Sequence, residues 1–91
     1  MVTIDGPVAR DGIPPLCDRV RSLLGTCSRT RVVCDVSAIH DPDAVTVEAL
    51  ARMQLTARRL GGAIVLRDPC ADLMRLLDLC GLAGAVPLEP C

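Results

Sequence analysis

The chain contains no phenylalanine, tyrosine or tryptophan, and its 91 residues include no lysine. Without aromatic side chains it has no means of stacking nucleic-acid bases, gripping sugar rings or caging quaternary cations. The ten basic residues are all arginines and are interspersed with eleven acidic residues, which gives a net charge of −1. The sequence has no run of basic residues that could contact successive phosphates, so we expect no direct binding to nucleic acid.

Long apolar runs and closely paired cysteines are also missing. No stretch approaches the ~20 apolar residues that span a bilayer, and the amino end has neither the basic nor the long apolar segment of a secretion signal. The lone histidine, His40, has no Cys or His at metal-ligand spacing. We therefore predict a cytoplasmic protein that inserts into no membrane and carries no metal or other cofactor. Six cysteines would invite a disulfide interpretation, but none forms a CxxC pair and we expect reduced thiols at Cys17, Cys27, Cys34, Cys70, Cys80 and Cys91.

The length suits one small domain, residues 1–91, whose core is built from aliphatic side chains. Hydrophobic periodicity and turn residues predict strands and helices in alternation. Such alternation is typical of an α/β domain with a small, mostly parallel sheet of about four strands and about three helices. The predicted strands are residues 2–8 (at a sheet edge), 31–36, 63–66 and 85–88, and the predicted helices follow Pro14-Pro15, span 43–60 and follow Asp68-Pro69.

Finer features of these elements are predicted from residue types. The continuous apolar run 31–36 is typical of a strand covered on both faces. Gly25 ends the first helix, and Asp68 caps the third with Pro69 at its first position. Cys80 belongs to the buried stripe of that third helix. On the middle helix the apolar side is predicted to comprise Val47, Leu50, Ala51 and Leu55, widened by Met53, Ala57 and Leu60.

Acidic residues gather where the central strand runs into the middle helix. In parallel sheets, ligand and partner sites lie at the carboxyl ends of the strands, and here that edge carries residues 37–46 and 67–70. Asp43 is suited to cap the helix by accepting an N–H from Val45 or Thr46, although Asp41 with Pro42 could equally start it. No nucleophile–base pair, phosphate loop or carboxylate dyad is present, so nothing in the sequence indicates catalysis.

From residue 31 to 88 the chain resembles the STAS domain, the fold of bacterial anti-sigma factor antagonists. The family pattern is a strand ending in Asp and a small residue, a loop reaching Asp-Ser, a helix, Gly-Gly, a strand, and a helix closing on Gly-Leu. Asp35-Val36-Ser37, Asp43, Gly61-Gly62 and Gly81-Leu82 occupy those places at matching separations. The resemblance implies a non-enzymatic domain that regulates transcription by partner switching.

Two departures from the family pattern bear on the mechanism. The family has a further strand ahead of residues 2–8, which is missing here. Ala44 falls on the serine that partner kinases phosphorylate, and alanine accepts no phosphoryl group. Thr46, two residues on, is either a displaced phosphoacceptor or a capping residue. Asp41 and Asp43 are either partner contacts or caps, or a carboxylate pair that imitates a permanently phosphorylated surface.

The resemblance implies an anti-sigma factor of the histidine-kinase-like ATPase class as the partner. It is expected to dock on the loop before the middle helix and on that helix, through Asp41, Asp43, Ala44, Val45, Thr46 and Glu48. The alternative is an accessory subunit of an ABC-type lipid transporter, gripping a transporter ATPase subunit through the same surface. A homodimer through a sheet edge and a thiol function of Cys70 are further alternatives.

Overall fold

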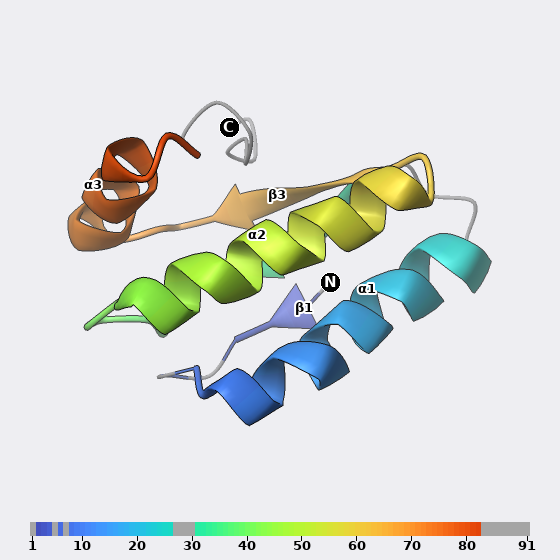
Figure 1. Ribbon diagram of the computed structural model, residues 1–91, viewed down its shortest axis with the longest axis horizontal. Coiled ribbons are helices and arrows are strands. Elements are labelled where there is room, and N and C mark those ends of the chain that lie inside the picture. The colour runs from blue at the N-terminus through green and yellow to red at the C-terminus, as the bar shows by residue number, and fades with distance from the viewer. Residues whose placement is uncertain (1, 5, 7, 27–30, 83–91) are drawn as a thin grey trace.

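A computed structural model describes residues 2–4, 6, 8–26 and 31–82 and shows an α/β domain (Figure 1). This confirms the predicted fold class. The described chain contains three α-helices and three parallel strands, and the predicted strand 85–88 lies outside the described residues. None of its helices combines the length and apolar character needed to cross a membrane. The elements are β1 (Val2–Thr3), the 3-10 turn η1 (Arg10–Gly12), α1 (Ile13–Thr26), β2 (Arg31–Asp35), α2 (Ala44–Arg59), β3 (Ala63–Arg67) and α3 (Ala71–Leu79).

The strand order β1-β2-β3 explains where the helices lie. Each crossover moves one strand over in the same direction, and right-handed crossovers then place both connecting helices on one face of the sheet. α1 and α2 accordingly run side by side on that face and pack against each other (Figure 1). β1 lies at an edge, as predicted, but is two residues long. A homodimer through a sheet edge stays a prediction.

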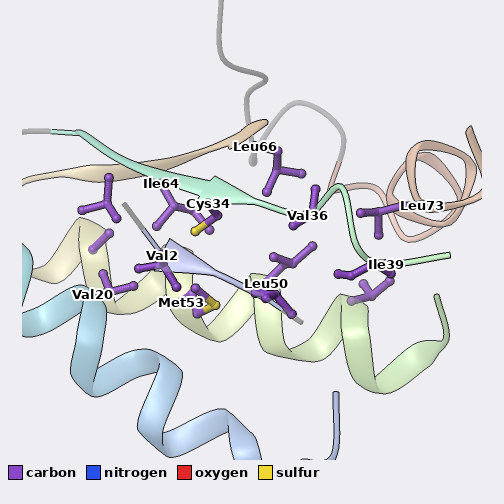
Figure 2. Packing of buried hydrophobic residues seen from close by; sticks show 14 of the residues in the cluster. Val2, Val20, Cys34, Val36, Ile39, Leu50, Met53, Ile64, Leu66 and Leu73 are labelled. Carbon is purple, nitrogen blue, oxygen red and sulfur yellow. The ribbon is translucent and has the colours of Figure 1, made fainter. Parts of the chain in front are cut away.

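The core lies mainly between the sheet and these two helices, with Leu73 and Leu77 added from α3, and its side chains are aliphatic apart from the sulfur-containing Cys34 and Met53 (Figure 2). β2 contributes Val32 and Cys34, and burial raises the pKa of the Cys34 thiol to about 12, which makes it a small apolar filler rather than a nucleophile. The other face of β2 is less covered than predicted, because Val33 is only half-buried. The two-sided burial expected there is found in β3, at Ile64, Val65 and Leu66.

The buried side of α2 differs from the predicted stripe. Leu55 and Leu60 are 51% and 48% exposed, so the prediction that they are buried is wrong. The helix faces the sheet with Leu50, Met53 and Ala57. At about 100° per residue, Leu55 lies roughly 140–160° around the helix from each of them, on the side away from the sheet. The buried residues of α2 are Thr46, Val47, Ala49, Leu50, Met53, Gln54 and Ala57.

Gln54 occupies a core position although it is polar, because its amide pairs with the backbone of β3. The Ile64 N–H donates to Gln54 Oε1 at 2.7 Å, and Gln54 Nε2 donates to the Ile64 carbonyl at 3.5 Å. A buried amide with both ends bonded avoids the desolvation cost of an unpaired polar group. Gln54 thus ties α2 to β3 by hydrogen bonds as well as by apolar packing.

Three details of the other helices also correct the sequence analysis. α1 continues through Gly25 to Thr26. α3 is capped by Cys70 rather than Asp68, so Pro69 precedes the helix. Cys80 is exposed, because the buried stripe of α3 is carried by Leu73 and Leu77 and the helix ends at Leu79.

Candidate functional site

The loop from β2 to α2 leaves the carboxyl edge of the sheet and is held at both ends. At its start, Asp35 Oδ1 accepts hydrogen bonds from the Ser37 backbone N–H at 3.0 Å and from Ser37 Oγ at 2.7 Å. These two bonds hold the pKa of the Asp35 carboxyl below its usual value. The Ile39 N–H donates to the Val36 carbonyl at 3.1 Å, and the Ile39 side chain is buried in the core. The loop is therefore anchored before it reaches Asp41.

At its other end the loop is closed by a capping box between Asp43 and Thr46. Asp43 Oδ1 accepts from the Thr46 backbone N–H at 3.0 Å and from Thr46 Oγ1 at 3.1 Å, and the Asp43 N–H donates to Thr46 Oγ1 at 3.5 Å. The bonds from Thr46 hold the pKa of Asp43 below its usual value. The prediction that Asp43 caps the helix is confirmed. Of the two predicted donors, Val45 and Thr46, it is the Thr46 N–H that bonds the Asp43 side chain.

The six residues expected to contact a partner, hereafter the docking patch, differ in accessibility. Asp41, Asp43 and Ala44 are exposed, whereas Val45 and Glu48 are half-buried. Glu48 also lies 4.0 Å from the Arg52 guanidinium, one helical turn on. Ala44 is the first residue of α2 and follows the cap directly. The patch therefore presents a small, fixed side chain flanked by carboxylates, and its role in binding stays a prediction.

Thr46 lies in the same patch but is only 2% exposed. Its hydroxyl is used twice in the capping box, as a donor and as an acceptor. A kinase could reach this oxygen only if the first turn of α2 opened. The geometry therefore supports the capping interpretation of Thr46, and its phosphorylation stays a prediction.

A hollow of about 350 Å³ borders the docking patch. Its walls come from the β2–α2 loop and, from the segment after β1, from Gly6, whose φ of 82° suits glycine. Sequence reasoning missed this hollow. The available signal was the Asp-Gly-Pro sequence that follows the first predicted strand, because loops that follow parallel strands meet at one edge of the sheet. The lining residues are Gly6, Ala38, Ile39, His40 and Asp41.

The reactive side chains near this edge form no catalytic or metal-binding cluster in the described ranges. No three His, Cys, Asp or Glu residues there are placed to hold a metal ion. Cys70 caps α3 without a side-chain hydrogen bond, and it is half-buried against the core. His40 is exposed at the rim of the hollow. This arrangement offers a rigid contact surface and no acid–base or nucleophilic machinery among the residues described.

Comparison with known proteins identifies the family of the chain. No curated protein matches the chain. A family model described as "Mlab, STAS domain" matches residues 1–90, which is nearly the whole sequence. The strand, capped helix and following strand that carry the docking patch lie inside that match. The chain therefore belongs to the STAS domain family.

Proposed function

We propose that the protein is a non-enzymatic interaction regulator of the anti-sigma factor antagonist type, which binds its partner through the docking patch. STAS domains are generally binding modules without enzymatic activity, and this chain belongs to that family. The observation that carries the proposal is the fixed geometry of the patch. Asp43 and Thr46 lock the first turn of α2, so that the side chain of Ala44 is held in one position beside the loop that carries Asp41. Such preorganisation lowers the entropy cost of association.

The proposed partner is an anti-sigma factor of the histidine-kinase-like ATPase class. Binding would sequester that protein and release a sigma factor. Two exposed carboxylates, Asp41 and Asp43, would face basic groups of the partner, and the neighbouring hollow would receive one of its side chains. The hollow supports this role because its walls belong to the same loop as the patch.

The patch also supports binding that phosphorylation does not switch. In the family resemblance Ala44 takes the place of the phosphorylated serine, and it is exposed at the first position of α2. The patch's one hydroxyl, on Thr46, is buried and bonded. A kinase would find no accessible acceptor among these six residues, so the partner would be held constitutively.

Constitutive binding equally suits a second candidate function, an accessory subunit of an ABC-type lipid transporter. A permanent subunit needs a stable contact and no charge switch, which is what Ala44 and the buried Thr46 provide. In this case the patch would grip a transporter ATPase subunit from the cytoplasmic side. The two candidates share the surface and differ in the partner.

Affinity capture from the native host distinguishes them. The tagged chain is expected to retain one ATPase, identified by mass spectrometry as a histidine-kinase-like protein or as a transporter subunit. Ala44→Arg should abolish capture, because a long charged side chain would stand in the centre of the contact. Arg19→Ala, on an exposed part of α1 away from the patch, is the matched control and should capture normally. Retention of the same ATPase by Ala44→Arg would contradict the proposal.

The charge contribution is measured separately with the purified partner. Asn caps helices about as well as Asp, so Asp41→Asn/Asp43→Asn removes two charges while keeping the first turn of α2. The hypothesis that the two carboxylates imitate a phosphorylated surface predicts at least tenfold weaker binding, about 1.4 kcal/mol. Unchanged affinity would dismiss that hypothesis and leave shape as the basis of docking.

A further inference from the structure

A second concave surface lies on the outer side of the helix pair and begins one helical turn beyond Glu48, the last residue of the docking patch. α1 and α2 run side by side (Figure 1), and between them opens a groove of about 570 Å³. It is formed by α1 from its start to Arg21 and by the second half of α2. The residues lining this α1–α2 groove are Ile13, Pro14, Cys17, Asp18, Arg21, Arg52, Leu55, Thr56 and Arg59.

The groove is positively charged. Among the described residues that line it are three arginines and a single carboxylate, that of Asp18. Asp18 is paired with Arg21 at 2.7 Å, with both side chains largely exposed. Arg52 has only the 4.0 Å contact with Glu48, and Arg59 makes no ion pair with any described residue. Two guanidinium groups on one side of the groove are therefore available to external carboxylates.

The same wall carries an apolar side chain that the fold leaves in solvent. Leu55 lies between Arg52 and Arg59 in the chain, at helical spacings of three and four residues, so the three share one side of α2. It is 51% exposed although it occupies the middle of the helix. On the opposite wall, exposed Pro14 and half-buried Cys17 provide apolar surface, whereas Ile13 is buried beneath it. An apolar strip bordered by arginines matches an amphipathic segment with acidic flanks.

We propose that the α1–α2 groove binds an acidic amphipathic helix of a partner protein, at a site separate from the docking patch. Charge complementarity selects acidic residues beside Arg52 and Arg59, and Leu55 selects an apolar residue between them. Concavity favours a helix over a lipid bilayer, because a flat surface cannot enter the groove. Leu55 lies eleven residues beyond Ala44, about 16 Å along α2, so both surfaces can be occupied together.

A labelled peptide tests this proposal directly. The probe is a 15-residue helical peptide with leucines at every third or fourth position flanked by glutamates, and binding is followed by fluorescence anisotropy at 50 mM salt. Arg52→Glu/Arg59→Glu should weaken binding at least ~tenfold, and 500 mM salt should weaken binding of the unaltered protein similarly. Leu55→Ser should weaken it by about fivefold, the loss of one partly buried apolar contact. Arg75→Glu, on the exposed side of α3, is the matched charge control and should bind within about twofold of the unaltered protein.

The contrary results are equally defined. Absence of peptide binding, unchanged binding by the double arginine variant, or equal binding of the same peptide with lysines in place of glutamates would each overturn the proposal. So would Leu55-dependent binding to phosphatidylglycerol vesicles that the peptide does not displace, because it would assign the surface to a membrane. Asp41→Asn/Asp43→Asn should bind the peptide normally, which keeps this test independent of the docking patch. Urea midpoints of all variants establish that they are folded.

Discussion

Two loops of this molecule have almost the same sequence and begin their helices differently. Asp41-Pro42-Asp43 leads from β2 into α2, and Asp68-Pro69-Cys70 leads from β3 into α3. In both, the third residue is the N-cap and an alanine is the first helical residue. Proline therefore stands before the cap in each case, and the acidic residue ahead of it caps nothing.

The difference between the loops lies in the side chain of the third residue. Asp43 closes a capping box with Thr46, whereas Cys70 makes no side-chain cap hydrogen bond. The chain before Cys70 is also less regular, since Asp68 has a φ of 53°, a left-handed value that non-glycine residues rarely adopt. The comparison shows what the carboxylate of Asp43 adds: it fixes the start of α2 through side-chain hydrogen bonds, whereas the start of α3 has backbone hydrogen bonds and packing only.

The most disruptive way to break the first loop is to place a charge inside its capping box. Thr46→Asp should lower the free energy of unfolding by about 3 kcal/mol, because a buried carboxylate would face that of Asp43. Ala44→Asp, two residues away and exposed, should change it by less than about 0.5 kcal/mol, since acidic residues suit the first turn of a helix. Urea unfolding compares the two variants. Equal losses would show that Thr46 is not enclosed as described.

Removing the cap itself should have a smaller effect. Asp43→Ala leaves the Thr46 N–H without its partner and should cost about 1 kcal/mol. Asp43→Asn keeps an oxygen acceptor and should stay within a few tenths of a kcal/mol of the unaltered protein. Thermal and urea unfolding measure both. A large loss in the Asn variant would mean that charge, rather than capping, holds the loop.

The second loop can be made to resemble the first. Cys70→Ser is nearly isosteric and supplies a hydroxyl that can accept an N–H of the first turn of α3. We expect a gain of about 0.5 kcal/mol, below the usual value of a cap because the half-buried Cys70 also packs against the core. Cys80→Ser, at an exposed position after α3, is the control and should be neutral. Destabilisation by Cys70→Ser would show that packing of the thiol outweighs capping.

The smallest expected difference concerns acid. Hydrogen bonds from Thr46 lower the pKa of Asp43 in the folded state, so ionised Asp43 stabilises the fold above its unfolded pKa of about 3.9. That contribution is lost as the pH falls through the lowered folded pKa. Asp43→Asn has no such titration and should lose less stability than the unaltered protein between pH 5 and pH 2. Urea unfolding at each pH gives the free energy of unfolding of both proteins. If that free energy falls equally with pH in both, Asp43 is not the group responsible.

Much of the fold could be predicted because the strands and helices are punctuated clearly. Gly61-Gly62 separates α2 from β3, and the run around Val32 defines β2. The errors on α2 arose because its apolar residues are compatible with more than one buried side of the helix. Leu55 and Leu60 fit an apolar stripe as well as Met53 does, and only packing against the sheet selects between them. Hydrophobic patterns do not predict the burial of Gln54, because that burial depends on hydrogen bonds to the backbone of β3, ten residues further along the chain.

The candidate site was predictable to a different degree. Asp43 as N-cap follows from residue type and position, and the structure confirms it. The prediction that Asp68 caps α3 with Pro69 as its first residue is wrong, because Pro69 lies before the cap and Cys70 takes that position. The burial of Thr46 depends on contacts between segments that are distant in the sequence. The same is true of the hollow between Gly6 and the β2–α2 loop. Those contacts arise from tertiary folding, so local patterns do not predict them.

The pairing of Gln54 with Ile64 also bears on how the sheet can grow. The Val36 N–H bonds the Arg67 carbonyl, so alternate residues of β3 starting from Arg67 face β2, while Ile64 and Leu66 turn their peptide groups outward. The glutamine fills the position at Ile64 where an incoming strand would bond. Any added strand, from this chain or another, is left with Leu66 as its first anchoring point. Gln54 thus limits the part of this edge that a further strand can pair with to the residues beyond Ile64.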